Sequence, residues 1–160
     1  MWANVVTLEP ADAIARVYEE QGSRMWRSLY AFSADAEIAS DALAEAFAQA
    51  IARGDSLHAP DRWIWAASFR IAAGELKRRR GVGGVTEQDA TYLMPEPTVD
   101  LVRALRKLSP RQRAVVILSL YADYPTKEVA GILGASQATV RVHLSQGRKR
   151  LRALLEDDDG

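Results

Sequence analysis

Residues 126–144 read TKEVAGILGASQATVRVHL, and this stretch has the spacing of a helix-turn-helix. A helix of about eight residues is followed by a short turn containing Gly134 and by a second helix that Ser136 can cap. Ala130 is small at the position where the two helices would cross. The outer face of the second helix carries side chains that can bind base edges or phosphates in a major groove: Gln137, Arg141 and Ser145.

Positive charge is concentrated around this stretch, although the whole chain is neutral, with 21 basic and 21 acidic residues. Residues 101–155 contain eleven basic and two acidic residues, a net charge of +9. Arg148, Lys149, Arg150 and Arg152 extend the second helix as a handle for phosphates. The coincidence of spacing, capping and basicity favours DNA binding over a plain helical hairpin with a solvated basic face.

The rest of the chain also predicts helices, so we expect an all-α fold of two small helical domains. The first domain, residues 1–80, contains helices over Ala11–Phe32, Ala36–Arg53 and about Asp61–Arg80, and Leu43, Phe47 and Ile51 are expected in its core. Residues 81–99 contain three glycines and two prolines and predict a flexible linker. The second domain, residues 100–160, contains the helix-turn-helix and an earlier helix that Ser109 caps, with Gln112 completing a capping box.

The third helix combines aromatic side chains with a cationic end. Trp63, Trp65 and Phe69 precede the run from Lys77 to Arg80. Aromatic rings beside cations suit single-stranded DNA, because bases stack on the rings while the cations bind phosphates. The alternative is that the rings are core residues and that the cations complement the negative end of the helix. That alternative is stronger for Trp63 than for Trp65.

Asp41 and Glu45 lie four residues apart on the helix face opposite Leu43 and Phe47. Two like charges at this spacing repel one another slightly, and no Lys or Arg lies within one turn to relieve them. They are therefore either solvated or available to a basic partner. We expect no catalytic role for this carboxylate pair, because no histidine or metal ligand accompanies it.

Composition excludes several further classes of function. The chain has no cysteine and two histidines, so we expect no disulfide, no metal site and no cofactor. No apolar run approaches the length of a membrane span, and the N-terminus lacks a secretory signal pattern. A non-enzymatic protein of the cytoplasm is the expectation.

Four stretches together resemble the extracytoplasmic-function (ECF) group of bacterial sigma-70 factors, over about residues 13–155. VYEEQGSRMWRSLYAFSAD, ASDALAEAFAQA and WIWAASFRIAAGELKRRR are similar to the helices of sigma region 2. The stretch from Leu101 to Leu155 is similar to region 4. The resemblance implies a protein that directs core RNA polymerase to promoters, with region 2 at the −10 element and region 4 at the −35 element.

The resemblance also assigns residues. Asp41 and Glu45 would bind the β′ clamp helices of the polymerase, region 4 would meet the β flap, and an anti-sigma factor is a further implied partner. The −10 element would be bound and melted by a loop and the third helix, through Ser56, Leu57, His58, Arg62, Arg70, Lys77, Arg78, Arg79 and Arg80. The −35 element would be read by Ser136, Gln137, Thr139, Arg141, His143, Ser145 and Arg148.

Two other functions fit the same motifs. One is a helix-turn-helix regulator that binds duplex DNA without polymerase. The other is a sigma-like adaptor that binds polymerase without opening promoters. Arg70 and Gly74 favour this interpretation, because they stand at positions where the family usually has Asn and Asp.

Overall fold

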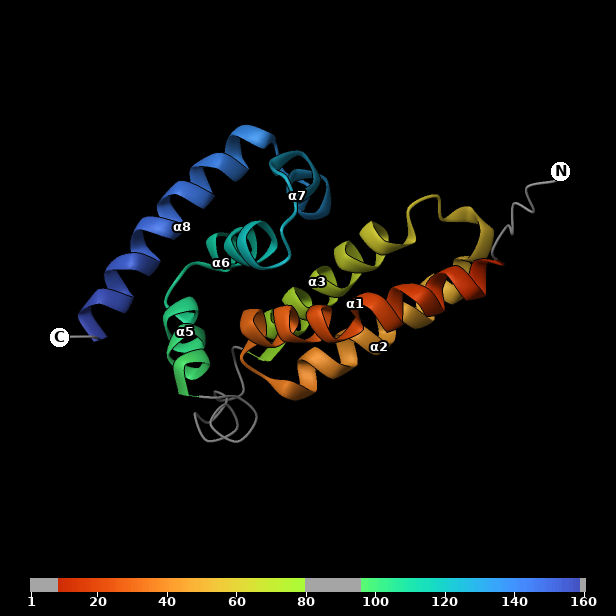
Figure 1. Cartoon of the computed structure of the whole chain (residues 1–160), viewed down its shortest axis with the longest axis horizontal. Helices are drawn as coiled ribbons and strands as arrows, with labels where there is room; N and C mark the ends of the chain where they lie inside the picture. Colours follow the sequence, from red (N-terminus) through yellow and green to blue (C-terminus); the bar gives the residue numbers. More distant parts are fainter. Residues whose placement is uncertain (1–8, 80–95, 159–160) are drawn as a thin grey trace, which may run out of the picture.

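The part of the chain that the structure describes is helical throughout (Figure 1). The computed structural model describes residues 9–79 and 96–158. The N-terminal half contains α1 (Pro10–Ser33), α2 (Ala36–Arg53), the 3₁₀ turn η1 (Gly54–Ser56) and α3 (Pro60–Arg79). The C-terminal half contains α5 (Glu96–Arg106), α6 (Pro110–Val116), the π-helical turn η2 (Ile117–Tyr121), α7 (Thr126–Leu133) and α8 (Gln137–Asp158). The predicted all-α class is confirmed.

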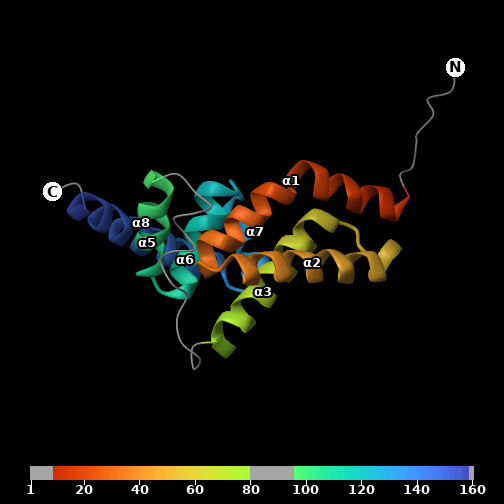
Figure 2. The ribbon, with the colours of Figure 1, turned by 90° about the horizontal axis from the view of Figure 1, so that it is seen from below.

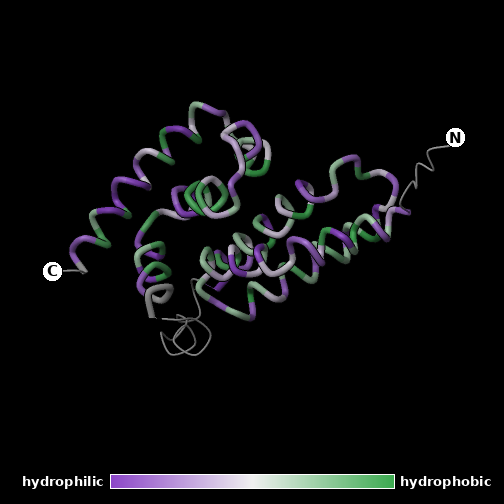
Figure 3. The backbone as a smooth tube through the Cα atoms, viewed as in Figure 1, coloured by the Kyte–Doolittle hydropathy of each residue, from purple (hydrophilic) through white to green (hydrophobic). Residues whose placement is uncertain are grey.

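The N-terminal half is a three-helix unit with a tight turn between α1 and α2. Ala34 ends α1 at a φ of 56°, and its N–H donates to the Tyr30 carbonyl at 2.7 Å. Asp35 then caps α2, because its Oδ1 accepts hydrogen bonds from the N–H groups of Glu37 (2.9 Å) and Ile38 (3.2 Å). Hydrophilic and hydrophobic positions alternate along these helices (Figure 3). Their apolar faces enclose the core residues Met25, Leu29, Ile38, Ala46 and Ile64.

The first helix of the C-terminal half begins earlier than the sequence predicts, and the cap of α6 lacks one predicted hydrogen bond. Helix α5 begins at Glu96, so the last four residues assigned to the linker are helical; Pro97 is tolerated there, because a first-turn N–H has no partner within the helix. Residues 80–95, the rest of that linker, lie outside the described residues. Ser109 caps α6 as predicted, accepting from the Gln112 N–H at 3.2 Å. The Gln112 side chain completes no capping box and instead donates to Gln146 Oε1 of α8 at 3.4 Å.

Three predicted burial assignments need correction or refinement. Ile51 is 61% exposed, whereas Leu43 and Phe47 are buried. Each step of four residues turns a helix about 40° past a full turn, so Ile51 has rotated about 80° from Leu43. Trp65 is buried, and its Nε1 donates to Gln21 Oε1 at 2.9 Å. Trp63, the stronger core candidate, is half-buried beneath the Arg53 guanidinium, 4.9 Å from the ring centroid.

The two halves pack against one another, which the sequence did not predict. Figures 1 and 2 show α3 beside α7 and the end of α1 beside α5 and α6, and the same pairs of helices are in contact. Buried apolar residues of both halves form one continuous core. None of the described helices is both long enough and apolar enough to span a membrane.

Candidate nucleic-acid interface

The α7–α8 pair has the geometry of a helix-turn-helix. Helix α7 ends at Gly134, whose φ of 63° is the left-handed backbone that glycine adopts without strain. Ser136 Oγ then accepts a hydrogen bond from the Thr139 N–H at 3.1 Å and so caps α8. Val129 and Val140 are fully buried between the helices. This packing fixes the N-terminal end of α8 as an outward-facing element.

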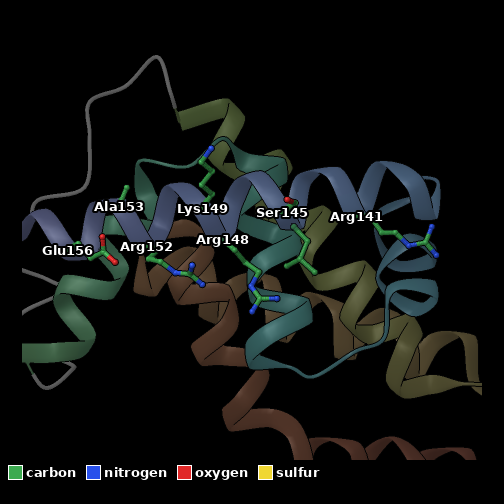
Figure 4. Close-up of a pocket in the computed structure, with 8 residues that line it drawn as sticks. Arg141, Ser145, Arg148, Lys149, Arg152, Ala153 and Glu156 are labelled. Carbon is green, nitrogen blue, oxygen red and sulfur yellow. The ribbon is translucent and has the colours of Figure 1, made fainter.

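A groove with a volume of about 560 Å³ runs along one face of α8 (Figure 4). Its lining comes entirely from that helix: Arg141, Leu144, Ser145, Arg148, Lys149, Arg152, Ala153 and Glu156. Arg141, Arg148, Lys149 and Arg152 are all exposed, so four cations lie within four turns of one helix. Such a row of cations can neutralise successive phosphates of a nucleic-acid backbone.

The predicted −35 residues fall into three environments. The four that are exposed on α8 are Gln137, Arg141, Ser145 and Arg148. Ser136 and Thr139 hydrogen-bond to one another through their hydroxyl oxygens, 2.8 Å apart, so both already serve the cap. His143 is half-buried, and its buried Nδ1 forms no hydrogen bond with any described residue.

His143 lines a second cavity, of about 460 Å³, which lies between the two halves of the molecule. Arg70 and Phe69 of α3 form part of one wall, and Gly134 and Ala135 of the α7–α8 turn form part of the other. The structure therefore brings a predicted −10 residue, Arg70, and a predicted −35 residue, His143, to the same cavity.

Four more of the predicted −10 residues lie between the end of η1 and the start of α3. Ser56 is exposed, and its Oγ donates to the Arg53 carbonyl at 2.9 Å. Leu57 packs against the core, whereas His58 is exposed. Arg62 is exposed but engaged, because its Nη1 donates to Glu128 Oε2 of α7 at 2.9 Å.

The cations at the end of α3 also differ from one another. Lys77 is exposed, and Arg78 is exposed while paired with Glu75 at 2.6 Å. Arg79 joins α3 to the start of α2, at 3.1 Å from Asp35, 3.5 Å from Glu37 and 3.1 Å from Glu75. Its hydrogen bond to Glu75, with the nearby carboxylates, raises the pKa of the guanidinium above its usual value. Arg80 lies outside the described residues.

Asp41 and Glu45 are both exposed on α2, as their spacing predicts. Glu45 Oε1 accepts a hydrogen bond from Gln49 Nε2 at 3.0 Å. No ion pair reaches either carboxylate from the residues that the structure describes. The pair is therefore open to a basic partner.

Comparison with known proteins gives a consistent result. The family model described as "Sigma-70, region 4" matches residues 98–151. The ECF RNA polymerase sigma factor SigL of Mycobacterium tuberculosis is 27% identical over 155 residues, which cover 88% of each chain. The RNA polymerase sigma-E factor of Streptomyces avermitilis is 32% identical over 117 residues, covering 61% of this chain and 65% of that protein. The chain is therefore similar to ECF sigma-70 factors over most of its length.

Solved structures show the same fold. The sigma factor RpoE of Bartonella quintana, in complex with the anti-sigma factor NepR, matches with a TM-score of 0.69 and 22% identity, over 88% of this chain and 97% of that one. CnrH, in complex with the cytosolic domain of CnrY, matches with a TM-score of 0.68 and 24% identity, over 91% and 89%.

Two residues at the contact between the halves of the molecule were missed by sequence reasoning. Tyr124 lies edge-on to Trp65 with ring centroids 5.6 Å apart, and Glu128 holds Arg62. Glu128 and Asp123 are the only acidic residues between 101 and 155. That isolation in a basic segment is the signal that could have drawn attention to Glu128.

Proposed function

We propose that this sigma factor binds core RNA polymerase and brings it to promoters through two separate DNA contacts. The observation that carries the proposal is the helix-turn-helix whose second helix presents a row of exposed cations. A helix of this kind enters the major groove with its N-terminal residues against base edges. Helix α8 then reads the −35 element, while α3 and its preceding loop bind the −10 element.

Within α8, residues near the N-terminus and residues further along have different tasks. Gln137 and Arg141 lie in the first two turns and are exposed, so they read base edges. Arg148, Lys149 and Arg152 lie further along the groove and bind phosphates, which adds salt-dependent affinity without sequence preference.

The −10 strand is bound by the loop around His58 and by the cations Arg62, Arg70 and Lys77–Arg80 of the third helix. Support comes from the exposure of His58, Arg70 and Lys77 on one connected segment. Among those cations that the structure describes, Arg79 is the least available, because it already bridges three carboxylates. Its contribution is to hold α3 against α2 and so to position its neighbours.

Polymerase binds at two places in this proposal. The exposed carboxylates of Asp41 and Glu45 meet basic groups of the β′ clamp helices, and the C-terminal half meets the β flap. The sigma factor performs no covalent step, needs no cofactor, and acts in the cytoplasm, where core polymerase works. Because the two structural relatives are complexes with NepR and CnrY, an anti-sigma factor is proposed as its regulator.

The direct test is run-off transcription with purified core polymerase, the purified protein and a pool of promoter fragments. Promoter-dependent transcripts that require the protein are the expected result. Tight binding to duplex DNA without any association with polymerase would overturn the proposal in favour of a conventional regulator. Association with polymerase without transcripts from any fragment would overturn it in favour of an adaptor.

A further inference from the structure

An exposed valine lies among the polar side chains of α8. Val142 is 52% exposed, whereas the leucines of the same helix are all half-buried. Valine has a lower helix propensity than alanine or lysine, because its branched side chain loses rotamers in a helix, and at this position it gains no burial in return. Neither helix propensity nor core packing therefore explains why a valine stands here.

Val142 lies on the face of α8 that the proposed function turns towards DNA. It follows Arg141 directly, and it precedes Lys149 by seven residues. Seven residues make nearly two full helical turns, so Val142 lies in one row with Lys149, an exposed residue that lines the α8 groove (Figure 4). Because α8 begins at Gln137, Val142 stands in the second turn, where a recognition helix meets base edges.

The residue one turn before Val142 on this face is also apolar. Ala138 lies four residues earlier and is exposed as well. Neither side chain carries a charge or makes a hydrogen bond, so neither of them binds a phosphate or a polar atom of a base. The group that an apolar side chain contacts in the major groove is the C5 methyl of thymine, which the other bases lack.

We propose that Val142 is a specificity-determining residue that selects thymine in the −35 element by packing against the C5 methyl group. This inference rests on the proposed function, since it assumes that α8 reads duplex DNA. Neighbouring Cα atoms lie about 3.8 Å apart and neighbouring base pairs about 3.4 Å apart, so the thymine lies within about two base pairs of the base that Arg141 contacts. The valine contact neutralises no phosphate and so adds sequence preference without adding salt dependence.

The test removes the methyl group from the DNA and the apolar side chain from the protein. Preferred −35 duplexes are first selected from a random library with core polymerase and the full chain. Deoxyuridine, which lacks the C5 methyl, then replaces each thymine of the selected element in turn. Affinity is measured for the wild type, for Val142→Ser and for the matched control Val142→Ile, which keeps a branched apolar side chain.

At one thymine, we expect deoxyuridine to weaken binding by the wild type about fourfold, the effect of one buried methyl group. Val142→Ile keeps this loss, whereas Val142→Ser binds the thymine and deoxyuridine duplexes equally. At every other thymine the three proteins respond alike. The double comparison assigns the loss to the contact between the methyl group and the side chain rather than to either group alone. Because Val142 is exposed, the circular dichroism spectra of the three proteins should agree.

Two results would overturn the inference. One is a selected −35 element that contains no required thymine, or none at which deoxyuridine weakens binding. The other is a loss for Val142→Ser equal to that of the wild type, which would assign the methyl contact to another residue. If no sequence is selected at all, the proposed function itself fails, whereas a selected sequence without the methyl dependence refutes the role of Val142 alone.

Discussion

Asp35 carries two structural tasks on one carboxylate. Oδ1 caps α2 through the N–H groups of Glu37 and Ile38, and Oδ2 binds the Arg79 guanidinium at 3.1 Å. Asp35→Ala removes both, and we expect a loss of about 1–2 kcal/mol in the free energy of unfolding, measured by urea denaturation. Asp35→Asn keeps the cap and loses only the ion pair, so its loss stays below about 1 kcal/mol. Equal losses in the two variants would contradict this division.

Tyr124 makes the contact between the halves sensitive to alkaline pH. Burial raises the pKa of its phenol from 10.0 to about 12, and the charges of Asp61 and Glu128 add to the rise. Because the folded protein disfavours the phenolate, this contribution to stability is complete below pH 10 and is lost as the pH rises towards about 12.

The measurement for Tyr124 is the difference in unfolding free energy between the wild type and Tyr124→Phe as a function of pH. Phenylalanine keeps the ring against Trp65 but cannot ionise. We expect the difference to be constant below pH 10 and to move in favour of the variant above it. A difference in unfolding free energy that stays constant through this range would show that the pKa of Tyr124 is the same in the folded and unfolded protein.

Arg141 is the exposed arginine nearest the N-terminal end of α8, so the proposed function gives it the task of discriminating between bases (Figure 4). Arg141→Ala is expected to lose about 1–3 kcal/mol of binding free energy on preferred −35 sequences and much less on others. Lys149→Ala, a phosphate-binding control, weakens all sequences alike and reduces the dependence on salt. Titrations with a panel of duplexes separate the two patterns, and a uniform loss for Arg141→Ala would contradict a base-reading role.

At the scale of elements, α6 and α8 cross where Gly147 lets them approach. A Cβ built on Gly147 would lie 2.8 Å from Cγ2 of Val116, a buried branched side chain with little room to move. We expect Gly147→Ala to destabilise the protein by about 1 kcal/mol, because overpacking outweighs the gain in helix propensity.

The control for this crossing is Gly74→Ala on α3. A Cβ there meets nothing within 4 Å, so helix propensity acts alone and the variant gains up to about 1 kcal/mol. Thermal unfolding of both variants gives the comparison. A stabilised Gly147→Ala protein would mean that α8 shifts away from α6 without penalty.

For the whole molecule, the face of α2 is expected to decide whether polymerase binds. Asp41→Lys combined with Glu45→Lys reverses both charges at exposed positions, so it should abolish co-purification with core polymerase and leave the helical circular dichroism spectrum intact. Glu19→Lys with Glu20→Lys makes the same change in charge on exposed positions of α1 and should leave binding intact. Equal loss in both variants would indicate general electrostatics rather than a docking face.

The sequence predicted what neighbouring residues determine. The caps at Ser109 and Ser136 and the turn at Gly134 involve groups within a few positions of one another, so local spacing was sufficient. The helix-turn-helix and its basic face were predicted for the same reason.

Contacts between distant residues could not be predicted in this way. Trp65 and Trp63 were ranked in the wrong order, because the contacts of Trp65 include residues distant in the sequence, Gln21 on α1 and Tyr124 from the other half. The partial burial of His143 and the pairing of Arg62 with Glu128 depend on how the halves pack. Helical periodicity reports which face of a helix is apolar and not which partner covers it.

Because the two halves share one continuous core, their separation is unfavourable in free energy for an isolated molecule. Phe32 and Phe69 on one side, and Ala114 and Val115 on the other, would meet water as soon as the halves part. The exposure of this apolar surface to water favours closure of the two halves, or association with a second open molecule. A partner that binds the open conformation must therefore bury these apolar groups against its own surface. Open molecules without such a partner are expected to aggregate.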